Sequence, residues 1–505
     1  MQRQSRDDFA TPALRPWPVL AAIIAVQALC WIAAPMLVAD APPLDVIENT
    51  VWGTEHILIS YKNPALSSLM LEAARLMTGA IGWPAYVLSQ MCIAATFLCV
   101  FLLGREPLGD ARALAGTMLL TACYYFGWHT PEFNQDILEM PFWAATSLAL
   151  WRAVDRNTPI WWIALGAIAA GSLYGKLSAA VLLAAAGLWL LIDPKARGKF
   201  TTYGPWLAIA VFALVVAPLA NALAHGGLAA IAEYAVGRGN RHAANVFKWL
   251  GLQTIVVLPM ALVAWICGYL TNTPNTTFKK ENAGGALALN NERFTFFLLW
   301  MTLAPIFITM LAAIVEGTGD KFMWGVPMMN LVGLLLVAHA RPEITDHALR
   351  RLTVISVALI LSVAAAFAAS TYYRPQLTAQ PSRQNWPQTA IAQRFRQIWQ
   401  TETGVPLRIV AGDAMNWVSG LIALSSGDIA SVLTSADYSK SPWITPDRVA
   451  REGMLVVWPD VGKGLPKELA ALAGGSVQRY EEFPLSRPGR AKSVRVGYVV
   501  IPPAK

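Results

Sequence analysis

Long uninterrupted blocks of apolar residues are the feature that most constrains how this chain folds. A helix needs about 20 predominantly apolar residues to cross a bilayer, and backbone amides in hydrocarbon must be satisfied within the chain. The sequence contains eleven blocks near this length, so we predict a mainly α-helical, polytopic membrane protein with about 11 transmembrane helices. The predicted spans are 17–39, 86–104, 113–127, 137–151, 159–174, 177–192, 203–224, 251–270, 294–315, 322–340 and 352–370.

The composition supports this class and excludes others. Hydrophobic residues make up 55% of the chain and charged residues 14%, whereas soluble domains carry about 25% charged residues. A soluble enzyme, a disordered chain and a nucleic-acid-binding protein are therefore excluded. The first block, 17–39, exceeds the 7–15 residues of a signal-peptide core, so we expect an anchor that is not cleaved.

The distribution of lysine and arginine predicts the orientation. If the N-terminus is cytoplasmic, the cytoplasmic segments before residue 371 hold sixteen of these residues and the opposite loops hold seven. Cytoplasmic loops of membrane proteins are enriched in such residues. An odd number of spans then places the C-terminal part of the chain outside the cytoplasm.

The last part of the chain differs in kind. Residues 371–505 carry 26 charged residues, and short β-like runs at 407–410, 454–458 and 494–501 alternate with helical and Pro/Gly-rich stretches. We predict a transmembrane domain at 1–370 and an extracytoplasmic α/β domain at 371–505. All five cysteines fall in predicted spans, so neither a disulfide framework nor a cysteine metal site is expected.

The first predicted non-cytoplasmic loop, residues 40–85, contains a polar helical face. Asp45, Glu48, Trp52 and Glu55 recur at helical spacing after two prolines. Such a helix would lie along the membrane surface with its carboxylates facing a cavity. The spacing is equally compatible with Asp45 as a helix cap and Glu48 as a solvated residue.

Further charged residues lie at the ends of predicted spans. Glu132 and Asp136 stand at the mouth of the span 137–151, where a carboxylate is costly unless it faces a polar cavity. Lys176 lies between two spans, either as a phosphate ligand or with its ammonium extended to the interface.

Two arginines in the loop 225–250, Arg238 and Arg241, suit an anionic lipid head group or are simply solvated. Lys321 is either a phosphate contact or an interfacial anchor.

These motifs, in this order, resemble one family. The first loop is similar to that of the glycosyltransferase family 39 and protein O-mannosyltransferase-like membrane enzymes, which include lipid A aminoarabinose transferases and rhizobial galacturonosyltransferases. The resemblance spans residues 17–340 and departs from the family pattern at Asn63, at Ala65 and in the position of Lys62. It rests on Asp45-x-x-Glu48-x-x-x-Trp52-Gly53, Tyr61-Lys62-Asn63-Pro64-Ala65-Leu66, His129-Thr-Pro-Glu132-Phe-Asn134, Gly175-Lys176 and Lys321-Phe-Met-Trp324-Gly-Val-Pro327.

The resemblance implies a GT-C fold and an inverting transfer of a sugar from a polyprenyl-phosphate donor to lipid A or lipopolysaccharide core, at the periplasmic face of a Gram-negative inner membrane. Asp45 would be the general base, with Glu48 orienting it or contacting the acceptor. Polyprenyl phosphate is a competent leaving group and the chain has no Asp-x-Asp motif, so no metal or other cofactor is expected. The expected substrate contacts are Trp52, Tyr61, Lys62, Glu132, Asp136, Lys176, Arg238, Arg241 and Lys321.

Other functions stay open at this point. A protein O-glycosyltransferase of the same fold is the closest alternative, and a transporter or flippase of lipid-linked sugars is another. Against transport stand the absence of an internal repeat and the scarcity of ionisable residues deep within the spans. A scaffold whose C-terminal domain binds partners is a third. The residues do not select a particular sugar.

Overall fold

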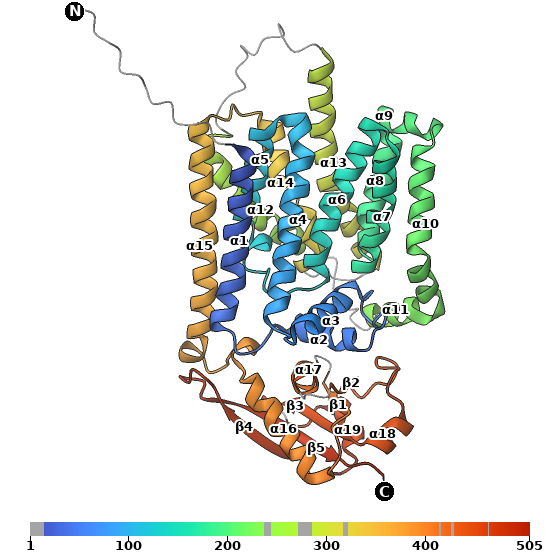
Figure 1. Cartoon of the computed structure of the whole chain (residues 1–505), viewed down its shortest axis with the longest axis vertical. Coiled ribbons are helices and arrows are strands. Elements are labelled where there is room, and N and C mark those ends of the chain that lie inside the picture. Colours follow the sequence, from blue (N-terminus) through green and yellow to red (C-terminus); the bar gives the residue numbers. More distant parts are fainter. Residues whose placement is uncertain are drawn as a thin grey trace, which may run out of the picture.

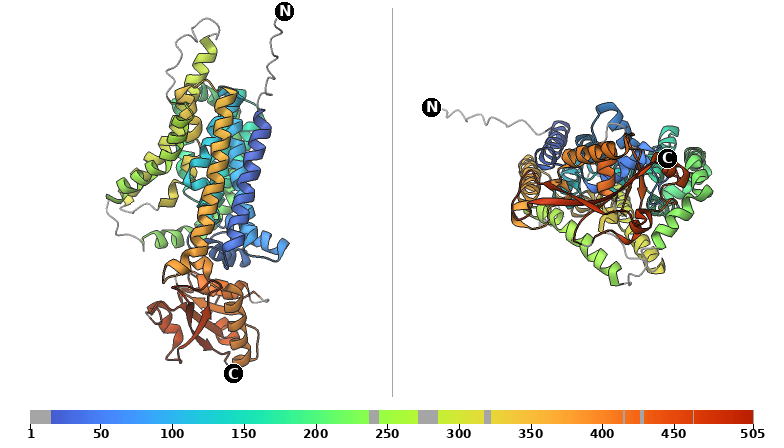
Figure 2. Two further views of the ribbon diagram at one scale, coloured as in Figure 1. Left: turned by 90° about the vertical axis from the view of Figure 1, so that its left-hand side faces the viewer. Right: turned by 90° about the horizontal axis from the view of Figure 1, so that it is seen from below.

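The computed structural model describes residues 15–236, 244–270, 285–316, 322–413, 416–425, 429–462 and 464–504 of the 505-residue chain. An upright bundle of helices forms one part of the molecule, and a smaller domain made of the C-terminal residues lies at one end of it (Figure 1). Figure 2 shows the same division from the side. The predicted fold class is therefore confirmed: a mainly helical membrane protein with a C-terminal α/β domain.

Most helices of the bundle run between its two ends. The bundle contains α1 (Pro16–Val38), α4 (Trp83–Leu108), α5 (Asp110–Leu119), α6 (Gln135–Arg156), α7 (Pro159–Gly175), α8 (Ala179–Ile192), α9 (Pro194–Arg197), α10 (Gly204–Ala222), α11 (Leu228–Val236), α12 (Ala244–Ile266), α13 (Gly285–Glu316), α14 (Val332–Ala340) and α15 (Asp346–Leu377).

In the described part of the chain, six helical segments have the length and apolar composition to cross a membrane. A seventh candidate is the pair 179–192 and 194–201, which bends by 87°, and two shorter apolar helices cover 159–175 and 327–340. The protein is thus a multi-pass membrane protein, while the number of eleven spans stays a prediction.

The predicted span 113–127 is not one regular helix. Helix α5 ends at Leu119, and two short 3₁₀ turns cover Leu120–Ala122 and Tyr124–Phe126. Most of this irregular segment is buried inside the bundle, although Tyr124 is exposed. The Gln27 amide donates to the Phe126 carbonyl. Irregular backbone is tolerated at membrane depth when protein groups satisfy it.

Two helices of the first loop lie across the end of the bundle, between it and the C-terminal domain (Figure 1). These are α2 (Leu44–Thr54) and α3 (Leu66–Thr78). They cross closely at Gly53, where a Cβ atom would stand 2.2 Å from the Ser68 carbonyl oxygen. Only glycine allows this approach, which fixes α2 against α3.

The C-terminal domain is built on a five-stranded sheet with the order β2-β1-β3-β5-β4. Strand β1 pairs parallel with β2 and β3, and β5 pairs antiparallel with β3 and β4. The strands are β1 (Ile409–Gly412), β2 (Ser431–Thr434), β3 (Met454–Pro459), β4 (Arg479–Pro484) and β5 (Ser493–Ile501), and the helices are α16 (Gln388–Thr403), α17 (Trp417–Leu424), α18 (Pro446–Glu452) and α19 (Lys467–Ala473).

The end of the bundle that lies far from the C-terminal domain is held by paired charges. Arg293 of α13 donates to both carboxylate oxygens of Asp193, at 2.9 and 3.0 Å, and to Asp155 at 2.9 Å. Lys195 also donates to Asp155, at 2.6 Å. The Arg293 guanidinium lies over the ring of Trp151, 4.5 Å from its centroid. This network, the Arg293 clamp, ties α6, α8 and α13 together.

Candidate functional site

Helix α2 presents Asp45 to the segment that leads into α6. Asp45 lies in the first turn, but the N-cap is Pro43 and no side chain caps the helix. The Asp45 Oδ2 atom instead accepts a hydrogen bond from the Asn134 amide at 2.8 Å. Asn134 is itself the N-cap of α6, because its Oδ1 atom accepts from the backbone N–H groups of Asp136 and Ile137. The cap of one helix therefore fixes the carboxylate of another.

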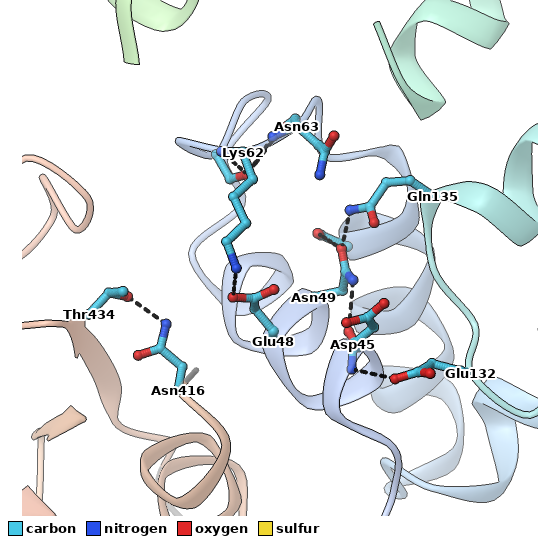
Figure 3. A network of polar contacts seen from close by, with 11 residues as sticks. Asp45, Glu48, Asn49, Lys62, Asn63, Glu132, Gln135, Asn416 and Thr434 are labelled. Atoms are coloured by element: carbon cyan, nitrogen blue, oxygen red, sulfur yellow. Dashed lines mark hydrogen bonds and ion pairs between the residues drawn. The ribbon is translucent and has the colours of Figure 1, made fainter. Parts of the chain in front are cut away.

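Glu132 also lies in the segment that leads into α6, and it stands beside Asp45 of α2. Its Oε1 atom accepts from the Asp45 backbone N–H at 3.4 Å (Figure 3). Burial, followed by the repulsion of the Asp45 charge, raises the pKa of Glu132 to about 7, and the Arg383 charge opposes this shift. The Glu132 carboxyl is therefore partly protonated near neutral pH, and its protonated form lessens the repulsion of the Asp45 carboxylate.

Asn49 fixes the helix that carries Asp45. It is 1% exposed, and its Oδ1 atom accepts from Gln135 at 2.6 Å and from the hydroxyls of Ser67 and Ser68 at 3.1 Å. Its amide donates to the Asp45 carbonyl at 2.7 Å. One buried amide thus joins α2, α3 and α6, and Figure 3 shows its contacts with Asp45 and Gln135. Asn49 was not among the predicted site residues, although it follows Asp45 by one helical turn.

Glu48 belongs to an adjoining group rather than to the Asp45 pair. Its carboxylate forms an ion pair with Lys62. The Lys62 ammonium lies over the rings of Trp52 and Tyr61, 5.5 and 5.4 Å from their centroids. Trp52 is only 2% exposed and Tyr61 7%, so both rings pack inside the protein and neither offers an open face.

Lys176 directly follows α7 and forms an ion pair with Asp136 at 2.6 Å. Its ammonium lies 5.9 Å from the centroid of the Trp324 ring. Glu139 follows Asp136 by one helical turn and is 1% exposed. One of its oxygens accepts from the Trp143 indole at 2.8 Å, and the other has no partner among the described residues. Lys176 therefore pairs with the carboxylate of Asp136, and the buried carboxyl group of Glu139 lies nearby.

A buried histidine completes this region. His129 is 6% exposed, and its Nε2 atom has no partner in the described part of the chain. Burial lowers the pKa of His129 to about 4, although the charges of Asp136 and Asp45 oppose this shift. The imidazole is therefore neutral at physiological pH.

The predicted site residues thus fall into three sets. Asp45, Glu132, Asp136 and Lys176 lie together at the mouth of the bundle. Glu48, Trp52, Tyr61 and Lys62 form the adjoining group. Arg238, Arg241 and Lys321 lie outside the described residues.

Two further features of the described residues bear on this site. No group of three or more His, Cys, Asp or Glu residues has the arrangement of a metal site there, and metal independence stays a prediction. A cavity of about 650 Å³ is lined almost wholly by apolar residues of α6, α7, α8 and α10, and none of the predicted site residues lines it.

Comparisons with known proteins define the class of this fold. Residues 62–220 match the family model described as dolichyl-phosphate-mannose-protein mannosyltransferase. The whole chain has the GT-C fold of membrane glycosyltransferases. Among curated protein sequences, none matches it.

Two solved structures cover nearly the full length of the chain. One is ArnT from Cupriavidus metallidurans bound to undecaprenyl phosphate, with a TM-score of 0.60, 11% identity and coverage of 95% of this chain and 97% of that chain. The other is the same protein in the apo state, with a TM-score of 0.57, 12% identity and coverage of 95% and 98%. At this identity the likeness establishes the fold.

Proposed function

We propose that this protein transfers a sugar from a polyprenyl-phosphate donor to lipid A or lipopolysaccharide core, at the periplasmic face of a Gram-negative inner membrane. The observation that carries the proposal is the convergence of Asp45, Glu132, Asp136 and Lys176. Asp45 belongs to α2, which lies where the bundle meets the C-terminal domain (Figure 1). A lipid-anchored donor and a polar acceptor meet at such a boundary. The similar ArnT structure is bound to undecaprenyl phosphate, which supports this class of donor.

Asp45 is the general base of the proposed reaction. The acceptor hydroxyl oxygen attacks the anomeric carbon, and its proton passes to the Asp45 carboxylate. The bond from the anomeric carbon to the phosphate oxygen breaks with inversion, and its electron pair leaves with the polyprenyl phosphate. The hydrogen bond from Asn134 holds one carboxylate oxygen in place, which directs the other oxygen toward the acceptor.

Lys176 is the first phosphate ligand of this proposal, and Lys62 is the second. Each lysine is already bonded to a carboxylate, Asp136 or Glu48. A bound phosphate must share the ammonium with that carboxylate, and in return the carboxylate fixes where the cation stands. Fixed cations stabilise negative charge on a leaving group without reorganisation during the reaction. Arg238, Arg241 and Lys321 are proposed as further substrate contacts.

The proposal is tested by mass spectrometry of lipid A and core oligosaccharide. Three kinds of cells are compared: with the protein, without it, and with Asp45→Asn. In a separate assay, sugar transfer in wild-type membranes is measured with and without EDTA, which removes divalent metal ions. We expect a mass difference of one sugar that requires the protein and Asp45 and persists in EDTA. An envelope glycan profile that is identical with and without the protein would overturn the choice of acceptor.

A protein acceptor is the second candidate, because the family model that matches residues 62–220 describes a protein mannosyltransferase. Intact-mass analysis of periplasmic and membrane proteins from the same cells decides between the two acceptors. A sugar found on proteins and absent from lipid A would favour this alternative.

A further inference from the structure

Helix α2, which carries Asp45, packs against other parts of the protein on two opposite faces. Successive residues of an α-helix are 100° apart, so Asp45 and Asn49 share one face of α2 while Ile47 and Val51 share the opposite face. The first face meets α6 through Asn134 and Gln135. Ile47 and Val51 are 0% and 2% exposed, so the second face is covered as well.

Helix α17 of the C-terminal domain covers the second face. A Cβ atom on Gly420 would stand 2.4 Å from Ile47 Cγ2 and 3.2 Å from Val51 Cγ2. The two helices therefore touch where α17 has no side chain. The contact belongs to an apolar core that joins Ile47, Val51 and Trp52 of α2 to the C-terminal domain, including Trp417 and Leu421.

Polar contacts hold both ends of the same loop helix. Before α2, the backbone N–H groups of Asp40 and Ala41 donate to the Gln384 carbonyl at 2.7 and 3.2 Å. After α2, Glu55 hydrogen-bonds Ser431 of β2.

One further contact lies beyond the helix itself. The Lys440 ammonium of the C-terminal domain lies 5.9 Å from the centroid of the Tyr61 ring.

Helix α2 has only 11 residues. Isolated helices shorter than about 12–15 residues are marginal in water, so tertiary packing must keep such a helix formed and oriented. The C-terminal domain supplies that packing on the face opposite to Asp45. We infer that the C-terminal domain is a positioning element of the candidate site: α17, through Gly420, holds α2 so that Asp45 meets Asn134.

This inference rests on the proposed function, because it concerns how the same site is positioned. A general base must lie within about 2.6–3.2 Å of the heavy atom whose proton it removes. A displacement of about 1 Å can cost on the order of 100-fold in rate. Loss of the α17 contact is therefore expected to lower transfer even though no residue of α17 reacts.

The test compares the full-length protein with three variants. Gly420→Ala places a methyl group against Ile47. Gly420→Ala combined with Ile47→Ala removes the side chain that the methyl group meets. Gly497→Ala is the matched control, because its Cβ would stand 2.2 Å from Trp458 inside the C-terminal domain. Hydrogen exchange of residues 44–54 is measured on purified protein, and the fraction of sugar-modified product is measured in cells.

Gly420→Ala is expected to speed exchange across 44–54 by about 10-fold or more and to lower the modified fraction by about 10- to 100-fold. In the double variant, the exchange rate of residues 44–54 and the modified fraction should both return most of the way to their wild-type values. Gly497→Ala should leave the exchange rate of α2 unchanged. Should Gly420→Ala fail to accumulate, Ile47→Ala alone weakens the same contact without a clash and should speed exchange in the same segment.

Three results would overturn the inference. One is exchange in 44–54 that Gly420→Ala leaves unchanged. Another is equal damage to α2 by Gly497→Ala, which would mean that only the folding of the domain matters. The third is faster exchange with full transfer. If the wild-type protein transfers no sugar, the proposed function fails while the exchange data still decide whether α17 holds α2.

Discussion

The two ends of the helical bundle handle buried charge in opposite ways. At the end far from the C-terminal domain, Arg293 and Lys195 face Asp155 and Asp193, and each carboxylate meets a cation. At the other end, Asp136 and Glu48 pair with lysines, but Asp45 accepts from an amide and Glu132 accepts from a backbone N–H. The first arrangement matches each carboxylate with a cation, whereas the second leaves Asp45 and Glu132 in partial repulsion.

This difference separates a structural use of charge from a chemical one. Matched charges that are also hydrogen-bonded keep helices in register. Carboxyl groups whose pKa values are pushed apart by burial and by each other are typical of sites that move protons. Substitutions at the first end should therefore change stability, and substitutions at the second end should change activity or its pH dependence.

The largest expected effect is the loss of sugar transfer in the Asp45→Asn variant. The amide keeps the shape of the side chain but cannot take the acceptor proton, and general bases contribute about 10²- to 10⁴-fold. We expect a loss of that size in sugar-modified product, with an unfolding midpoint in detergent close to that of the wild type. A variant that unfolds earlier but transfers normally would make Asp45 a structural residue.

A substitution in the Arg293 clamp should show the reverse pattern. Arg293→Met removes the cation shared by Asp155 and Asp193, and Asp193 is 5% exposed. Removing one partner of a buried ion pair costs about 3–5 kcal/mol. Thermal unfolding in detergent measures this loss, while the protein that remains folded should transfer sugar at the wild-type rate. Loss of transfer without loss of stability would erase the distinction between the two ends.

The sequence predicted some elements of the fold and not others. Apolar blocks and their order predicted the helical membrane class, because spanning segments carry their own signal in length and hydropathy. The block 113–127 breaks into turns, since Gln27, almost 100 residues away, supports the irregular backbone. Strands β1, β3 and β5 were predicted from their apolar runs. Strands β2 and β4 were missed: β2 has four residues and β4 carries charged side chains on a sheet edge.

The site was predictable residue by residue but not as a network. Helical spacing indicated that Asp45 and Glu48 lie near each other, yet it could not show that Glu48 pairs with Lys62 while Asp45 meets Asn134. Those contacts join segments almost 90 residues apart in the case of Asn134. Asn49 was missed because a buried asparagine has no sequence signature of its own; its role comes from three helices that meet around it.

A smaller effect is expected from the pH dependence of Glu132. Its pKa rises from an ordinary value of 4.5 to about 7 in the folded protein, so folding binds a proton between these two pH values. Stability from this group is therefore present at low pH and is lost as the pH rises toward 7. The loss amounts to at most about 3 kcal/mol, at 1.36 kcal/mol for each pKa unit. Between pH 5 and pH 8 the unfolding midpoint of the wild type should fall more than that of Glu132→Gln. Midpoints that change equally with pH in both proteins would contradict the raised pKa of Glu132.

The smallest effect is expected at Lys195, the outer member of the Arg293 clamp. Its side chain is 46% exposed, against 15% for Arg293, although both contact Asp155. Exposed ion pairs contribute about 0–1 kcal/mol because water screens them and a mobile side chain must be ordered. Lys195→Met should therefore shift the unfolding midpoint far less than Arg293→Met in the same detergent. Equal shifts would mean that the number of cations, and not their burial against Trp151, holds this end of the bundle together.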